Sequence, residues 1–198
     1  MEAWDVIVLG DGPAALHAAA EAAKSGASTL MMSATGLGNP GMAALEGLSA
    51  SLQESNNRSH REDTIRTGAF LCDQDIVAER TAGAIKQVDL LERRGVNFRR
   101  DQQGLPMVRK GAGHQQPRTV DAGSGTALGI QQVGEEQCMR YGVIRRGDQI
   151  PLTLVHTNQS VEGMIALDMV NGRIIGLQCK AMIIADEGFE GAYSSGVV

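Results

Sequence analysis

The N-terminal segment constrains the fold more than any other part of the chain. Trp4–Leu9 is an apolar run interrupted only by Asp5, the pattern typical of a buried parallel strand. Ala14–Lys24 is rich in alanine, the best helix former, and Gly26 can end that helix in a left-handed turn. A second apolar run, Ser28–Met32, follows at once. This order predicts a strand–helix–strand unit with parallel strands.

A glycine motif joins the first strand to the helix. The letters GDGPAA fit the pattern G-x-G-x-x-G/A, in which Gly10 allows a tight turn and Gly12 lets a pyrophosphate approach the backbone. Ala15 keeps the helix close to the strand, and the helix N-terminus adds N–H donors and partial positive charge. A purely structural turn can match the same pattern. In this context we predict that the turn holds the pyrophosphate of a dinucleotide, with its adenosine near Ser33.

The acid that usually completes such a site is missing. A nicotinamide-binding fold places Asp or Glu near the end of the second strand, where it holds the ribose hydroxyls. Here Ser33 and Ala34 occupy that place, and no acid occurs between Glu21 and Glu46. This composition disfavours NAD.

Two longer helices are predicted further along the chain. Asp73–Arg94 has a capping aspartate at its start, and Gly95 can end it. Ser124–Tyr141 ends before Gly142 and contains Gly134, an internal glycine that costs about 1 kcal/mol relative to alanine.

The remaining segments predict loops and strands. Residues 34–60 have the composition of a loop, and residues 102–122 are expected to cross a surface or a site. Strand-like runs follow, and Asn171–Gly172 is a dipeptide that tight hairpins prefer. The runs are Leu152–His156, Gly163–Val170, Arg173–Cys179 and Ala181–Ala185. We therefore predict an α/β fold, a Rossmann-like three-layer domain with a parallel sheet, flanking helices and a small antiparallel crossover sheet near the C-terminal end. Its first strand should be central in the parallel sheet.

Composition excludes several classes of function. A net charge of −5 and a pI near 5.4 argue against a nucleic-acid partner. No apolar run approaches the length of a membrane span, so no direct membrane insertion is expected. The three cysteines and four histidines are scattered, which predicts reduced thiols, a cytoplasmic protein and no metal site. No arrangement of residues suggests a nucleophile, and we assign no catalytic residue.

Several segments together give a resemblance to a known family. Ser33 ends the second strand, GLSASL begins at Gly47, and HREDTIRTGAFLCDQDIV spans residues 60–77. GHQQPRT at residues 113–119 and the stretch from 161 to 188 continue the match. With these segments, nearly the whole chain resembles the FAD-binding domain of the succinate dehydrogenase/fumarate reductase flavoprotein subunits.

The resemblance implies a cofactor, a reaction and partners. The cofactor would be FAD, and its binding residues would be Gly10, Gly12, Pro13, Ala14, Ala15, Ser33 and Gly47. In the complete protein, hydride would pass between the flavin and a dicarboxylate, succinate or fumarate. An iron–sulfur subunit is the implied protein partner, and partner subunits would be the route to the inner face of the membrane.

Three departures from the family pattern bear on these expectations. Pro40 stands where many members carry the histidine that attaches FAD covalently, so we expect non-covalent binding. Asp186 and Glu187 replace small residues near the cofactor, where negative charge disfavours a pyrophosphate and would weaken binding. The chain reaches Val198 before the family's capping domain begins. We therefore expect residues 1–198 to form a single FAD-binding domain that is inactive alone.

Two loop residues and one alternative function remain open. His114 could be a ligand or base, although a lone loop histidine is more often a hydrogen-bonding residue. Arg118 could line the cofactor cleft or form a structural salt bridge. Asp63 and Thr64 are expected to cap and tie a helix. The alternative function is a non-catalytic remnant or interaction module that keeps the dinucleotide-binding fold.

Overall fold

The order of strands and helices along the chain divides it into two units. In this computed structural model, residues 2–36 and 45–186 are described. One unit contains residues 1–42 and 134–198, and the other contains residues 43–133.

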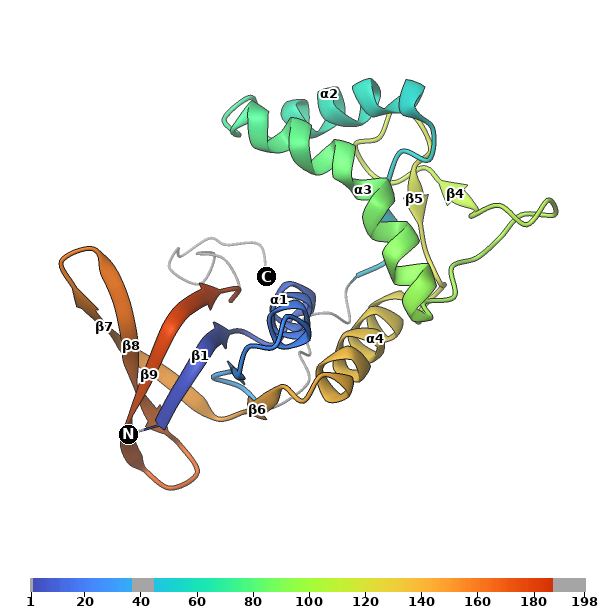
Figure 1. Cartoon of the computed structure of the whole chain (residues 1–198). Coiled ribbons are helices and arrows are strands. Elements are labelled where there is room, and N and C mark those ends of the chain that lie inside the picture. The colour runs from blue at the N-terminus through green and yellow to red at the C-terminus, as the bar shows by residue number, and fades with distance from the viewer. Residues whose placement is uncertain (1, 37–44, 187–198) are drawn as a thin grey trace. The chain divides into compact units, whose positions relative to one another are not determined.

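The first unit contains a sheet in which β1 lies among parallel neighbours (Figure 1). The described strands pair in the order β6-β2-β1-β9-β8-β7. Their bounds are β1 Glu2–Leu9, β2 Thr29–Met32, β6 Ile144–Arg146, β7 Gln149–Thr157, β8 Ser160–Asp168 and β9 Arg173–Ile184. Val8 of β1 pairs in parallel with Met31 of β2 on one side and with Ile183 of β9 on the other. The predicted central position of the first strand is confirmed.

The two faces of the parallel strands pack against different layers. Val8 and Met31 point to a core that contains Leu16 of α1 (Pro13–Lys24) and Cys138 of α4 (Thr126–Arg140). On the opposite face, the neighbouring residues of β1 and β2 pack against β8, where Met164 is fully buried. A helical layer, a parallel sheet and an antiparallel segment therefore form the layers of this unit, as predicted.

The C-terminal strands differ from the expected arrangement in one respect. The two predicted runs at 173–179 and 181–185 are one strand, β9, which pairs in parallel with β1 and antiparallel with β8. The predicted antiparallel strands near this end are present, since β8 pairs antiparallel with both β7 and β9, and β9 joins them to the main sheet. The predicted hairpin is present: Asp168 pairs with Arg173, and Gly172 has a φ of +63°.

The second unit combines helices with a small antiparallel sheet. Its described elements are β3 Leu48–Ser49, the 3₁₀ helix η2 Glu54–Asn56, α2 Asn57–Thr67, α3 Gln74–Arg94, β4 Val108–Arg109 and β5 Thr119–Val120. The strands pair in the order β3-β5-β4. Asp73 caps α3 by accepting from the N–H groups of Asp75 and Ile76, and Gly95 ends it at a φ of +112°.

The loop expected over residues 34–60 is wrong for its C-terminal part, which forms β3, η2 and the start of α2. The sequence of α2 is almost entirely polar, and its buried residues are His60 and Asp63. The apolar periodicity that normally marks a helix is therefore missing. Asp63 lies inside α2 and does not cap it, so the expected cap is also wrong, whereas Thr64 does tie the helix by donating to the carbonyl of His60.

Candidate cofactor-binding site

The turn between β1 and α1 brings the chain very close to the end of β9. Gly10 has a φ of +118°, a conformation that side chains rarely adopt. A Cβ added to Gly10 would lie 2.3 Å from the carbonyl oxygen of Ala185. The N–H of Ala185 in turn donates to the carbonyl of Leu9 at 2.8 Å. Only glycine fits at position 10, because the backbone of Ala185, just after β9, occupies the space of a side chain.

The N-terminus of α1 carries no cap from a side chain. Gly12 is the N-cap residue, with extended backbone angles, and Pro13 begins the helix. The N–H of Leu16 donates to the carbonyl of Gly12 at 3.0 Å, which closes the first turn. The N–H groups of Ala14 and Ala15 precede that bond, where an α-helix offers no intrahelical acceptor. The first turn contains no acidic residue, so the positive end of the helix dipole faces outward without a counter-charge from this turn.

A polar cluster adjoins the end of β2. Ser33 follows β2, is buried, and its hydroxyl lies 3.0 Å from that of Thr35. The Thr35 hydroxyl donates to the carboxylate of Asp11 at 3.2 Å. Asp11 is the middle residue of the glycine motif, and it is 8% exposed.

Sequence reasoning missed Asp11 as a site residue. An acid is expected at the end of the second strand, whereas Asp11 comes from the preceding turn and reaches the same neighbourhood through Thr35. The position of Asp11 inside the glycine motif could have identified it, because the motif places its second residue beside the expected pyrophosphate.

Of the three expected charge and attachment positions, Asp186 lies among the described residues. Asp186 directly follows Ala185 at the end of β9, next to Gly10. Glu187 and Pro40 lie outside the described residues.

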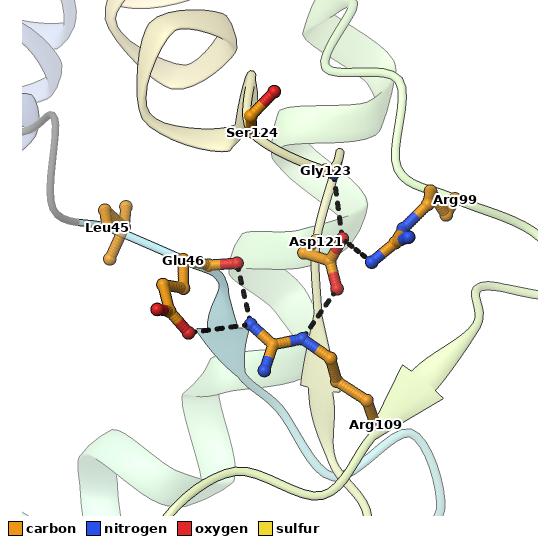
Figure 2. A pocket seen from close by; sticks show the side chains of 7 residues that line it. All are labelled: Leu45, Glu46, Arg99, Arg109, Asp121, Gly123 and Ser124. Carbon is orange, nitrogen blue, oxygen red and sulfur yellow. Dashed lines mark hydrogen bonds and ion pairs between the residues drawn. The ribbon is translucent and has the colours of Figure 1, made fainter.

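The second unit contains a separate polar pocket of about 510 Å³ (Figure 2). Asp121 is at its centre, with only 4% of its side chain exposed, and it accepts from Arg99 at 2.5 Å and from Arg109 at 2.9 Å. Burial raises the pKa of Asp121. The N–H of Gly123 and the two guanidinium groups lower the pKa by more than burial raises it, so the net shift is downward. Arg109 also contacts the exposed side chain of Glu46 at 3.5 Å. The pocket therefore holds a buried carboxylate, kept ionised by two arginines.

Gly47 adjoins this pocket through its neighbour Glu46. A Cβ on Gly47 would lie 2.7 Å from both the side chain of Thr119 and the carbonyl of Val120. A glycine at position 47 is thus required for the chain at the start of β3 to lie against β5. Among the predicted cofactor residues, Gly10, Gly12, Pro13, Ala14, Ala15 and Ser33 lie around one turn of the first unit, whereas Gly47 belongs to the second unit. Their assignment to cofactor binding stays a prediction.

The two open loop residues have clear surroundings. Arg118 is 2% exposed and contacts Asp63 at 2.9 Å, so the salt-bridge alternative is present. The ring of His114 lies 3.2 Å from the hydroxyl of Ser49 and accepts from the N–H of Gly111 at 3.3 Å. Both residues line a pocket within the second unit.

The described residues provide little for metal, thiol or membrane chemistry. Within residues 2–36 and 45–186, no group of three His, Cys, Asp or Glu side chains could hold a metal ion. Burial raises the pKa of the Cys138 thiol to about 11, which makes it a poor nucleophile. None of the helices in this described part is long and apolar enough to cross a membrane.

Comparisons with known proteins match this geometry. Residues 5–196 match the family model described as FAD binding domain. The chain is 28% identical over 198 residues to the succinate dehydrogenase flavoprotein subunit of Bacillus subtilis, covering 95% of this chain and 34% of that protein. It is 29% identical over 194 residues to the fumarate reductase flavoprotein subunit of Mycobacterium tuberculosis, covering 93% and 32%.

A solved structure gives the same result for the fold. Mycobacterium smegmatis Sdh1 in complex with UQ1 superposes with a TM-score of 0.87 at 23% identity, over 98% of this chain and 35% of that one. The chain thus spans about a third of the length of the relatives it matches.

Proposed function

The chain belongs to the FAD-binding domain family, whose cofactor is FAD, and on this premise we propose that the β1–α1 turn binds the FAD pyrophosphate. The observation that carries the proposal is the N-terminus of α1, which follows an extended glycine and has neither a side-chain cap nor an acid in its first turn. Backbone N–H groups and the helix dipole together favour an anion at this place. Ser33 and Gly47 complete the proposed set of cofactor residues, and both units would then form one FAD-binding domain.

The residues present fit this cofactor with one cost. Gly12 has no side chain to cap the helix, the N–H groups of Ala14 and Ala15 have no acceptor within it, and Ala14 is exposed. Asp11, however, places a carboxylate within the same turn, where negative charge repels a pyrophosphate. The proposed site therefore balances donors and the helix dipole against one acid.

We extend the proposal to the complete protein. Its relatives are named as flavoprotein subunits of succinate dehydrogenase and fumarate reductase, which supports hydride transfer with a dicarboxylate and assembly with other subunits. FAD, when bound, supplies the hydride acceptor or donor. The chain's own residues would hold and orient the cofactor, without a covalent link, because Pro40 replaces the attachment histidine. Partner subunits, with an iron–sulfur subunit among them, would bring the protein to the inner face of the membrane.

The test compares two substitutions of one exposed residue. Ala14→Asp adds a carboxylate to the first turn of α1, which favours the free helix by about 0.3–1 kcal/mol through its dipole but repels the pyrophosphate. Ala14→Asn has nearly the same shape without the charge. We expect A14D to keep its thermal stability and to bind FAD at least tenfold more weakly than A14N, measured by quenching of flavin fluorescence.

The result that would contradict the proposal is equal FAD affinity in A14D, A14N and the unchanged chain. A chain that binds no FAD in any form would favour the alternative, an interaction module that keeps the fold. Tight NAD binding without FAD binding would overturn the choice of cofactor.

A further inference from the structure

A second polar pocket in residues 43–133 has unusual buried donors. It has a volume of about 240 Å³ and lies where α2, β3 and the segment before β5 meet. Its main polar lining residues are Ser49, His60, Asp63, Thr64, His114 and Arg118. It is larger than the roughly 30 Å³ that one water molecule occupies in the liquid.

One carboxylate and two guanidinium groups meet at this pocket, and only one of the two guanidinium groups, that of Arg118, belongs to the lining. Asp63 is buried and accepts from the N–H of Gln115 at 2.7 Å, from Arg118 at 2.9 Å and from Arg66 at 2.5 Å. Burial raises the pKa of Asp63, but these donors lower the pKa by more than burial raises it. Asp63 therefore remains a carboxylate at neutral pH. The single carboxylate of Asp63 thus forms ion pairs with two guanidinium groups. Arg66 is half exposed and can be solvated, whereas Arg118 is buried.

Arg118 uses only part of its donor capacity. Its Nη2 contacts Asp63, but among the described residues Nε and Nη1 have no hydrogen-bond partner, although both atoms are buried. The Nδ1 atom of His60, in the same lining, is also buried without a partner in that part of the chain. Buried polar groups are almost always bonded to protein, water or an ion, and a buried guanidinium without acceptors is costly.

The opposite wall adds a hydroxyl that can donate. Since the N–H of Gly111 donates to Nδ1 of His114, the neutral ring carries its proton on Nε2, which can then donate to Ser49. The Ser49 hydroxyl, 3.2 Å away, is left free to donate its own proton. The walls therefore present several donors, among them a guanidinium with two unused nitrogens, a combination that favours an oxyanion over neutral water.

We propose that the pocket lined by Arg118, His60 and Ser49 binds a small oxyanion, a carboxylate or a phosphate group. Arg118 would donate from Nε and Nη1, Ser49 from its hydroxyl, and His60 from Nδ1. Arg118 is rigidly placed for this because Asp63 holds its remaining nitrogen. The site is independent of the proposed FAD site, since it uses none of the same residues.

Histidine titration supplies a second consequence of the geometry. Burial, together with the charges of Arg118 and His114, lowers the pKa of His60 to about 4, against a raising effect of Asp63. The pKa of His114 is also lowered, by burial first and then by the charges of Arg118 and Arg109, against a raising effect of Asp63. A bound anion offsets the positive charges, so it should raise the pKa of His60. By linkage, the anion should bind more tightly as the pH falls towards that value.

The experiment follows the ring signals of the chain's four histidines by NMR. Sodium phosphate and sodium acetate are titrated separately, with sodium chloride at equal ionic strength as the control. We expect saturable shifts of His60 and His114 with an oxyanion and none with chloride. Tighter binding of acetate would assign a carboxylate, and tighter binding of phosphate would assign a phosphate group.

Substitutions locate the response. Arg118→Lys keeps the charge but removes the Nε and Nη1 donors, and should weaken the anion at least tenfold. Arg66→Gln removes the other partner of Asp63 without touching the pocket lining, and should change affinity by less than about threefold. Should R118K not fold, Ser49→Ala removes one hydrogen bond and should cost about three- to tenfold.

Two results would overturn the proposal. One is an anion response equal to that of chloride, which would leave water as the occupant. The other is an unchanged response in both R118K and S49A. A14D separates this site from the FAD site: it should keep the response, and loss of the response in A14D would place the anion at α1 instead.

Discussion

Gly134 gives the sharpest test of how this structure uses glycine, because two opposed effects meet at one helical position. It lies inside α4, where replacing glycine with alanine normally stabilises a helix by about 1 kcal/mol. The structure opposes that gain. A Cβ at this position would lie 2.9 Å from both Cβ and Cδ1 of Leu16, a residue of α1 with no exposed surface.

The magnitude follows from which atoms must move. The Cβ atom of Leu16 is fixed to the α1 backbone, so a change of rotamer cannot relieve the contact. Overpacking of a buried contact costs about 1–3 kcal/mol. Set against a gain of about 1 kcal/mol, Gly134→Ala should lower the free energy of unfolding by up to about 2 kcal/mol. For a chain of this size, a loss of about 1 kcal/mol corresponds to a fall in Tm of about 2–4 °C.

Two control substitutions isolate the contact. Gly129 is also in α4, and its nearest neighbour would be the side chain of Val96 at 3.8 Å. Gly83 lies in α3 with nothing within 4 Å. Gly129→Ala and Gly83→Ala should each stabilise by up to about 1 kcal/mol in urea unfolding followed by circular dichroism. Equal stabilisation by G134A and G129A would contradict the close contact between α4 and Leu16 at position 134.

Further predictions concern charge and cofactor. Asp11→Asn keeps an acceptor for Thr35 but removes the charge beside the proposed pyrophosphate, so FAD affinity, measured by fluorescence titration, should rise about five- to tenfold; a fall would show that the carboxylate contributes to binding. Asp63→Ala leaves Arg118 buried without a counter-charge and should cost about 3–5 kcal/mol in urea unfolding, whereas a loss below 1 kcal/mol would contradict the ion pair. In the folded state, the pKa values of Asp63 and Asp121 lie below the unfolded value of 3.8. The stability that both carboxylates contribute is therefore complete above the unfolded pKa and is lost as the pH falls through the folded pKa values. Urea unfolding midpoints measured against pH should show this loss below about pH 4, and D63N should make the loss smaller. Acid precipitation of the FAD complex should leave all flavin in the supernatant, because Pro40 offers no attachment point, and flavin in the pellet would contradict this.

The features that sequence predicted are local ones. The β1–α1–β2 unit, the Asp73 cap and the end of α3 at Gly95 each depend on residues within a few positions of one another. Helix propensity, capping and apolar runs carry that information directly. The central position of β1 also followed, because the glycine turn must lie at the carboxyl ends of parallel strands.

The features that sequence reasoning missed depend on distant residues. The packing of α2 rests on Asp63 meeting Gln115 and Arg118, more than fifty residues away, and no apolar pattern marks such a helix. The pairing of Asp121 with Arg99 and Arg109 likewise arises only when β4 and β5 come together. Ion pairs of this kind have no fixed spacing in sequence, so only the fold identifies them.

The glycine motif itself divides into a structural half and a functional half. Gly10 is required with or without a cofactor, since the carbonyl of Ala185 occupies the place of its side chain. Its presence therefore carries no information about ligands. Gly12, at a φ of −75°, needs no glycine for its backbone, and serine or asparagine there would cap α1 and stabilise it by a few tenths of a kcal/mol. That stabilisation is absent, and Ala14 in the first turn is exposed and uncharged. An anion bound by the N–H groups would supply the missing cap, so within this motif Gly12–Ala15 point to a bound anion and Gly10 does not.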